Sequence, residues 1–130
     1  MSELVHVPVS IGELFDKYTI LLIKKENIKD TTKLDMVLKE IKYLYPYINN
    51  YNIDNIIINE LKEVNNELWI IEDKIRIKEL NKEFDDEFIK LARSVYITND
   101  KRSQIKNKIN YLLNSSLTDI KSYVNYNNNE

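Results

Sequence analysis

Residue types that carry much of protein chemistry are rare or absent in this sequence. The 130 residues include no cysteine, which excludes disulfides, thiolate metal sites and a cysteine nucleophile. Gly12 is the only glycine, and a single glycine cannot form a glycine-rich phosphate loop. His6 is the only histidine, and without cysteine beside it we expect a surface or packing role, not a metal site. We therefore predict a protein that uses no metal and no cofactor.

Long apolar runs and basic blocks are missing as well. The longest apolar run, residues 20–23, is far too short to span a bilayer, and the first residues lack the basic start of a signal peptide. The net charge is −2 and no cluster of Lys or Arg stands out, which disfavours nucleic-acid binding because that needs a basic face. We expect a cytoplasmic protein that binds neither a membrane nor a nucleic acid.

The rest of the composition is that of a folded domain. Hydrophobic residues make up 43% and charged residues 31% of the chain, as in globular proteins. A chain of this length can bury enough surface to fold without disulfides or metals. We predict a single helical domain over residues 1–124 and a disordered polar tail over residues 125–130.

Apolar residues recur at helical spacing along most of the chain, and this indicates an all-α fold. We expect a helical bundle of four to six helices with one long central helix and antiparallel neighbours. A capping box of Ser10 and Glu13 starts the first helix, Pro46 ends the second, and Thr98, Asn99 and Asp100 mark a break with a new N-cap. The predicted helices cover about residues 10 to 27–30, 32–45, 54–81, 85–97, 100–113 and 116–124, and Ser116 and Asp119 suggest a capping box for the last one.

The helix predicted over residues 54–81 has the clearest pattern. Its apolar residues alternate in steps of four and three, as in a coiled-coil seam of about three heptads: Ile57, Leu61, Val64, Leu68, Ile71 and Ile75. A helix of this length, about 42 Å, is expected to extend beyond its neighbours. Its excess length predicts a contact with a protein partner or a homodimer through residues 54–82.

Arginine is rare where lysine is abundant. Ile, Asn and Lys together form about forty per cent of the chain, far above ordinary usage, and their AT-rich codons indicate an AT-rich genome. Only Arg76, Arg93 and Arg102 are arginines. Against such a bias, we interpret them as positions that need the planar, bidentate hydrogen bonding of a guanidinium; chance is the alternative.

Trp69, Asp73 and Arg76 are spaced so that they share one face of their predicted helix. The only tryptophan, a carboxylate and a guanidinium on one face are suited to a planar or sugar-like ligand. The alternative is structural: Glu72 or Asp73 forms a salt bridge with Arg76 beside a core tryptophan.

A second group of candidates lies in the segment that contains Arg93, Tyr96 and Arg102. Arg102 stands one turn before Ile105 and should point partly inward, where it needs a carboxylate partner from Asp16, Asp73 or Asp100. This group is either part of a ligand site or an internal ion-pair network.

The start of the first helix is a third candidate. Its free N–H groups at residues 10–12, with Lys17 close by, could hold a phosphate or carboxylate, unless Glu13 occupies those donors. The full candidate ligand set is Lys17, Trp69, Asp73, Arg76, Arg93, Tyr96 and Arg102, and the candidates for structural ion pairs are Asp16, Glu72 and Asp100.

Residues 7–17, 68–76 and 92–102 together resemble an uncharacterised family, domain-of-unknown-function family 6165, and the resemblance extends from about residue 5 to 124. The resemblance implies a family that occurs in bacteria and some large DNA viruses, and the AT-rich composition fits a viral or parasitic origin, with the host cytoplasm as the location if the protein is viral. Family members often stand near glycan-modifying genes, which implies a link to glycan assembly. The resemblance implies no established activity.

Two functions compete on these grounds. The first is an interaction or oligomerisation module, favoured by the long helix and the lack of any catalytic motif. The alternative is a small-ligand binder or enzyme that acts on an anionic or sugar-like substrate through the Arg, Lys and Trp cluster, by electrostatic stabilisation. It requires those side chains to converge on one concave surface.

Overall fold

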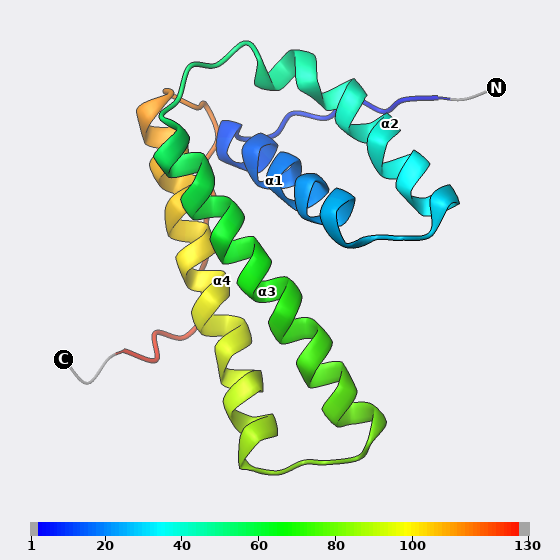
Figure 1. The fold of residues 1–130 in the computed structure, drawn as a ribbon. Coiled ribbons are helices and arrows are strands. Elements are labelled where there is room, and N and C mark those ends of the chain that lie inside the picture. The colour runs from blue at the N-terminus through cyan, green and yellow to red at the C-terminus, as the bar shows by residue number, and fades with distance from the viewer. Residues whose placement is uncertain (1–2, 128–130) are drawn as a thin grey trace.

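Four helices make up the structure, a computed structural model that describes residues 3–127 (Figure 1). Helix α1 spans Ile11–Asn27, α2 spans Thr31–Ile48, α3 spans Asn55–Leu80 and α4 spans Asp86–Leu112. Within the described residues there is no strand. The all-α prediction is confirmed, and the number of helices is at the lower end of the expected range.

Each helix begins after a side chain that accepts a hydrogen bond from a backbone N–H of the first turn. Ser10 accepts from Glu13, Asp30 from Lys33, Asp54 from Ile56 and Asp85 from Phe88. Such caps are local in sequence, which is why the predicted starts of these four helices agree with the structure to within one or two residues.

Two predicted helix ends are wrong. Helix α2 continues through Pro46 to Ile48. Pro46 lies in the last turn, where its missing N–H removes only one helical bond, and the Asn49 N–H still reaches the Tyr45 carbonyl at 2.9 Å. The break predicted at residues 98–100 does not exist, because α4 runs through it. The Asn99 side chain accepts a hydrogen bond from Arg102, and Asp100 forms an ion pair with Lys121. Neither side chain is therefore used to cap a new helix through the neighbouring backbone N–H groups.

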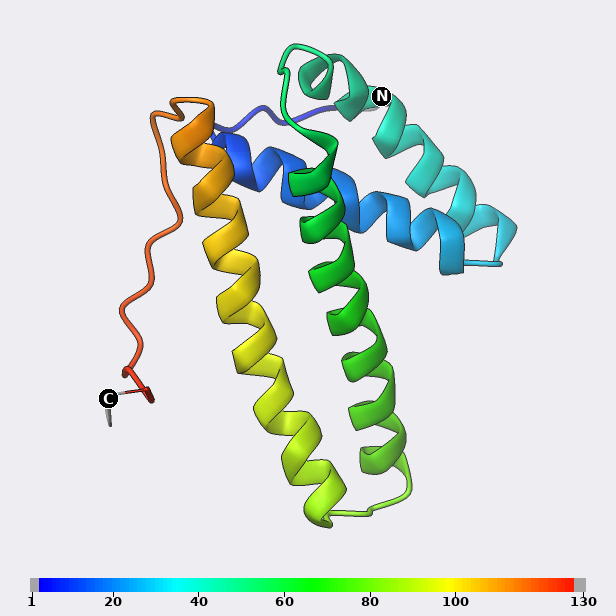
Figure 2. The same ribbon diagram turned by 60° about the vertical axis from the view of Figure 1, so that its left-hand side comes forward.

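The last predicted helix, residues 116–124, is also wrong. Residues 113–127 contain no helix and run along the outside of α4, as Figures 1 and 2 show. Asp119, expected near the N-terminal cap of that helix, binds side chains of α4 instead. Of the tail predicted to be disordered, residues 128–130 lie outside the described part of the chain.

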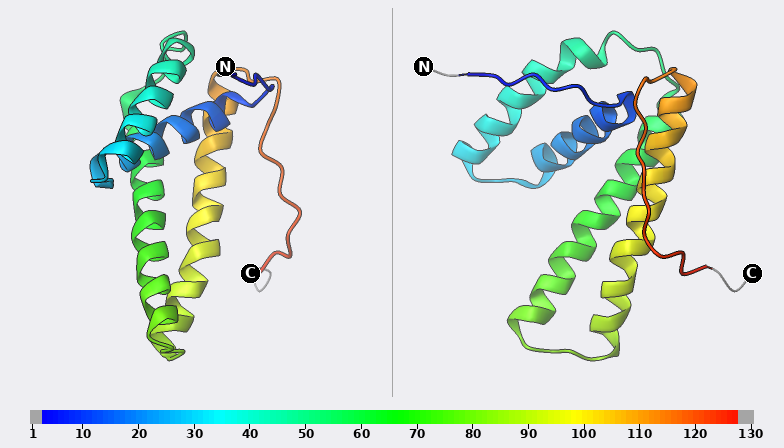
Figure 3. Two further views of the ribbon diagram at one scale, coloured as in Figure 1. Left: turned by 90° about the vertical axis from the view of Figure 1, so that its right-hand side faces the viewer. Right: turned by 180° about the vertical axis from the view of Figure 1, so that it is seen from behind.

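Helices α3 and α4 form a long antiparallel hairpin, and α1 crosses it near the end where α3 begins and α4 ends (Figures 1 and 3). Helix α2 folds back mainly on α1. The expected single long central helix is therefore replaced by two long helices of 26 and 27 residues. The core lies at the crossing, where Phe15, Ile57, Leu61 and Ile109 are buried.

The predicted seam of α3 divides into two halves. Ile57, Leu61 and Val64 are buried at the crossing with α1, whereas the later residues of the seam are only partly buried. Only α4 covers α3 at that level, so the far half of the hairpin is two helices thick (Figure 3). We call this half, residues 66–92, the arm. In the described residues no helix combines the length and the apolar character that a membrane span requires.

Gly12 sets how closely α1 approaches α4. A Cβ atom at this position would lie 2.3 Å from the carbonyl oxygen of Lys106 and 3.0 Å from Asn110 Oδ1. The only glycine of the chain thus serves a close approach between two helices.

Candidate functional site

A groove with a volume of about 440 Å³ lies where α1, α3 and α4 meet. Helix α3 supplies most of its wall, with two residues from each of the other helices. The lining residues are Ile20, Lys24, Asn65, Leu68, Trp69, Glu72, Asp73, Arg76, Asn99 and Arg102.

Four of the seven predicted ligand residues line this groove: Trp69, Asp73, Arg76 and Arg102. The first three are brought together by their spacing on α3, as predicted, and Arg102 reaches the same place from α4. Trp69 is partly buried, so one part of its indole remains available to a ligand.

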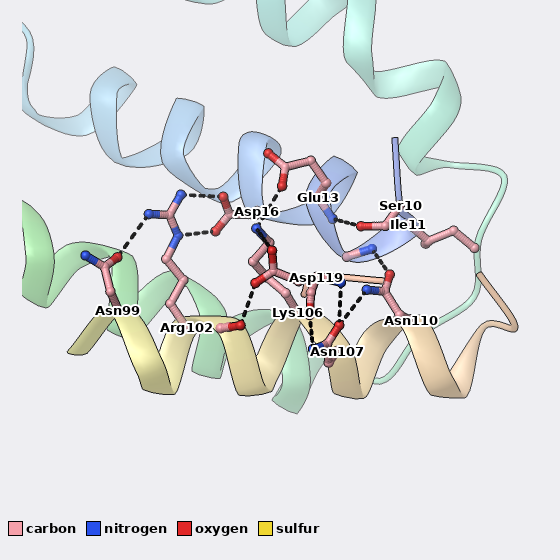
Figure 4. A network of polar contacts seen from close by, with 12 residues as sticks. Ser10, Ile11, Glu13, Asp16, Asn99, Arg102, Lys106, Asn107, Asn110 and Asp119 are labelled. Atoms are coloured by element: carbon pink, nitrogen blue, oxygen red, sulfur yellow. Dashed lines mark hydrogen bonds and ion pairs between the residues drawn. The ribbon is translucent and has the colours of Figure 1, made fainter. Parts of the chain in front are cut away.

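The Arg102 guanidinium is held in place by Asp16 of α1 (Figure 4). Its Nε lies 2.8 Å from Asp16 Oδ1 and its Nη2 lies 2.6 Å from Oδ2, which is a bidentate pair. The Asp16 side chain is almost fully buried. The hydrogen bond with Asp16 raises the pKa of Arg102 above its ordinary value, against the opposing effect of burial. The inward direction and the carboxylate partner predicted for Arg102 are both found.

Helix α3 completes this buried network. Asn65 Nδ2 lies 3.0 Å from Asp16 Oδ1 and 3.0 Å from Thr19 Oγ1, and the Thr19 hydroxyl donates to the Asp16 carbonyl. Asp16 thus joins α1 to both long helices. For Arg102 the geometry matches the internal ion-pair alternative, and its guanidinium forms one wall of the groove at the same time.

Arg76 is bound much less firmly. Its Nε and Nη2 lie 3.1 and 3.0 Å from Glu72 Oε2, one turn away on the same helix, and its side chain is 77% exposed. Exposed pairs of this kind contribute little to stability, so the guanidinium is available to a ligand at low cost. Asp73 and Lys24 have no ion-pair partner among residues 3–127.

The other three candidates lie elsewhere. Lys17 pairs with Glu40 of α2 at 2.8 Å. The Tyr96 ring contacts the Tyr126 ring edge to face, 5.1 Å between centroids, on the side of α4 that carries the C-terminal segment. Arg93 is exposed and does not line the groove. The three arginines therefore do not form one cluster.

The start of α1, considered as a candidate anion site, does not offer free N–H groups. The Ile11 N–H donates to Ser115 Oγ at 3.0 Å, the Gly12 N–H to Asn110 Oδ1 at 2.6 Å, and the Glu13 N–H to Ser10 Oγ at 3.1 Å. These donors are therefore occupied by the chain itself. The Glu13 carboxylate binds Lys106 Nζ at 2.7 Å (Figure 4).

One cluster escaped the sequence analysis. Ser103, Lys106, Asn107 and Asn110 form a polar face of α4 at helical spacing, and Asp119 of the C-terminal segment lies against it (Figure 4). Polar residues at such spacing are also typical of a solvated helix face. Their burial, and not their identity, distinguishes them here: Ser103, Lys106 and Asn110 are all less than 9% exposed.

The groove offers binding groups more than reactive ones. It combines an indole, two amides, two guanidinium groups, an ammonium group and two carboxylates, which can stack against and hydrogen-bond a small polar ligand. Among residues 3–127 no three His, Asp or Glu side chains are grouped as metal ligands.

The chain belongs to the family of unknown function DUF6165, whose model matches residues 5–128. No curated protein and no solved structure matches the chain.

Proposed function

We propose that this member of the DUF6165 family is an oligomerisation module that forms a two-fold dimer through α3. The exposure of apolar side chains on the arm carries the proposal. Apart from the groove that Ile20 and Lys24 of α1 also line, the arm consists of α3 and α4 alone (Figure 3).

The exposed surface of the chain supports an unfilled interface. The chain exposes 9880 Å², whereas a compact protein of 15.6 kDa exposes about 7,300 Å² by the usual scaling with mass, so the excess is about 2,600 Å². A stable protein interface buries about 1,200–2,000 Å² in total, so an excess of this size leaves room for one half of such an interface.

Ile70, Ile77 and Leu80 form a stripe along the outer side of α3, with exposed fractions of 45%, 55% and 79%. Residues seven and three apart lie on the same side of a helix. Leaving such side chains in water forgoes the favourable burial that a partner helix would provide.

Two residues of the stripe, Ile70 and Ile77, are complementary to each other across a two-fold axis. The midpoint between them lies between Asp73 and Lys74, which are exposed and of opposite charge. In an antiparallel dimer centred there, Ile70 faces Ile77 of the second copy, and Asp73 faces Lys74. Each pair occurs twice, as two-fold symmetry requires. The partner that fits this surface is therefore a second copy of the chain.

Sedimentation velocity of the full chain tests the proposal. We expect a dimer at micromolar concentrations, and Ile77→Asp should convert it to a folded monomer because it places a carboxylate in the apolar contact. Ile56→Asp is the matched control, since Ile56 is 65% exposed on the same helix but lies outside the contact. A monomeric wild-type chain, or a dimer that survives Ile77→Asp, would refute the proposal.

A charge exchange sharpens the test. Lys74→Asp alone places like charges opposite each other and should weaken the dimer at least tenfold. Adding Asp73→Lys to Lys74→Asp restores both pairs and should recover most of the affinity. No rescue would show that α3 does not pair in this register.

A second candidate function rests on a separate observation, the convergence of Trp69, Asp73, Arg76 and Arg102 on one groove. In this alternative the chain binds a small sugar-like or anionic ligand, in agreement with the glycan link that the family resemblance implies. A thermal-shift screen with nucleotide sugars and sugar phosphates tests it, because binding to the native state raises the melting temperature. The rise should disappear in Trp69→Ala and persist in Arg93→Ala, which lies outside the groove.

A further inference from the structure

The C-terminal segment, residues 113–127, runs along α4, and between its turns residues 118–125 have no regular secondary structure (Figures 2 and 3). The residues that hold it are polar. We call the three residues of α4 that bind Asp119 the clamp: Ser103, Lys106 and Asn107.

Asn107 binds the backbone of the segment in the manner of a neighbouring β-strand. Its Nδ2 donates to the Asp119 carbonyl at 2.8 Å, and its Oδ1 accepts from the Asp119 N–H at 2.8 Å. One side-chain amide thus pairs with both backbone groups of one residue (Figure 4). Since every residue except proline has these two groups, this contact selects an extended backbone and not a particular side chain.

The other two clamp residues select a carboxylate. Ser103 Oγ donates to Asp119 Oδ2, and Lys106 Nζ lies 3.8 Å from Asp119 Oδ1. Ser103 and Lys106 are 8% and 7% exposed, so they are held in place by their surroundings. Lys106 also binds Glu13 at 2.7 Å, which keeps its ammonium aimed at this position. The clamp therefore fits an extended segment that presents an acidic side chain.

The chain's own segment is a weak occupant of the clamp. The apolar side chains next to Asp119 remain in solvent, with Ile120, Tyr123 and Val124 exposed by 85%, 84% and 89%, whereas Leu113 and Tyr126 near the two ends of the segment pack against the core and against Tyr96. At Asp119 itself the attachment is polar, and a typical hydrogen bond contributes only about 1 kcal/mol net. Beyond Asp119 the segment is held by Lys121 and Tyr126, which both contact Asp100 on the surface.

We infer that the clamp is a recognition site for an extended acidic segment of a partner protein, and that residues 113–127 occupy it as an internal competitor. Backbone pairing by Asn107 accepts many sequences, the Ser103 and Lys106 pair requires a carboxylate, and the internal segment is released at low cost. This surface lies on α4, away from the stripe on α3, so the inference does not depend on the dimer.

A fluorescent peptide with the sequence of residues 115–124 serves as the probe, titrated against the full chain. Wild-type protein should bind it weakly, because the internal segment competes. The full-length Asp119→Ala variant weakens that competitor, so it should bind the probe at least tenfold more tightly. A probe whose aspartate is replaced by alanine should bind this variant at least tenfold more weakly.

Asn107→Ala and Ser103→Ala, each combined with Asp119→Ala, should reduce probe binding at least fivefold. Asn59→Ala in the same background is the matched control, because Asn59 is exposed on α3, and it should leave binding unchanged. Circular dichroism identifies any variant that fails to fold. If one of the two clamp variants, Asn107→Ala or Ser103→Ala, is unfolded, the binding of the probe to the other one tests the inference.

Two results would overturn the inference. One is a probe that binds Asp119→Ala no more tightly than wild type. The other is a dimer that forms in the wild type but dissociates in Asp119→Ala, although this change leaves the stripe on α3 intact. That result would show that the clamp of one copy holds the C-terminal segment of a second copy.

Discussion

Replacing Gly12 with alanine should destabilise this protein, although the same change usually stabilises a helix. Alanine is favoured over glycine by about 1 kcal/mol inside a helix. Here the added Cβ would meet the backbone of Lys106, with its carbonyl oxygen at 2.3 Å and its carbonyl carbon at 2.9 Å. A backbone atom cannot rotate away as a side chain can, so α1 and α4 must separate by about 1 Å to restore ordinary contact.

The magnitude follows from what that separation breaks. Overpacking of this kind costs about 1–3 kcal/mol. The Gly12 and Ile11 N–H bonds to Asn110 and Ser115 span the same contact and contribute about 1 kcal/mol each. After subtracting the gain in helix propensity, we expect a net loss of about 2–4 kcal/mol. For a chain of this size the melting temperature should fall by about 10 °C.

Urea denaturation followed by circular dichroism measures this loss as a lower midpoint with an unchanged slope. Asn59→Ala, an exposed helical position on α3, is the control for propensity alone and should be neutral or slightly stabilising. If Gly12→Ala were as stable as the wild type, the close approach of α1 to α4 would not exist as described.

Two further predictions concern charges. Asp16→Asn leaves Arg102 without its carboxylate and should lower the free energy of unfolding, measured by urea denaturation, by about 3 kcal/mol. This value is near the lower end for a broken buried pair because Arg102 is partly exposed. Lys17→Ala is the control, because it removes only an exposed pair and should lower the free energy of unfolding by less than about 0.5 kcal/mol. At the hairpin tip, the hydrogen bond from Lys78 lowers the pKa of Asp85 below its usual value of 3.8. The stability that the ionised Asp85 adds is therefore fully present above pH 3.8, and it is lost as the pH falls through the lowered pKa. In Lys78→Ala the Asp85 pKa, followed by NMR of its carboxyl carbon, should rise, and an unchanged value would refute the assigned cause.

The helix starts could be predicted because their determinants are local. Ser10, Asp54 and Asp85 cap their helices through bonds to residues two or three positions further along the chain. The failures occur where a distant residue competes with a local one. Asn99 has the intrinsic preference of a helix break, but its side chain accepts from Arg102, and Asp119 binds α4 in place of capping a helix of its own.

The candidate site could be predicted only as far as one helix extends. Trp69, Asp73 and Arg76 share a face because of their spacing alone, and they line the groove together. Which carboxylate pairs with Arg102 depends on how α1 crosses α4, over 86 positions of sequence separation, and the three candidates were equivalent by sequence. Arg93 and Tyr96 were grouped with Arg102 by proximity in sequence, but a helix turns neighbouring residues toward different sides.

The buried polar network explains why the arm stays uncovered. If no polar contacts fixed its position, α1 could slide along the hairpin toward its tip and cover more of the arm. Moving by one helical turn, about 5.4 Å, would separate Asp16 from Arg102 and Asn65 and leave a buried carboxylate without partners. Breaking a buried pair costs about 3–5 kcal/mol, more than the burial of one partly exposed isoleucine returns. The buried polar network at one end of the hairpin thus fixes the position of α1. The other end of the hairpin stays uncovered, as the proposed dimer requires.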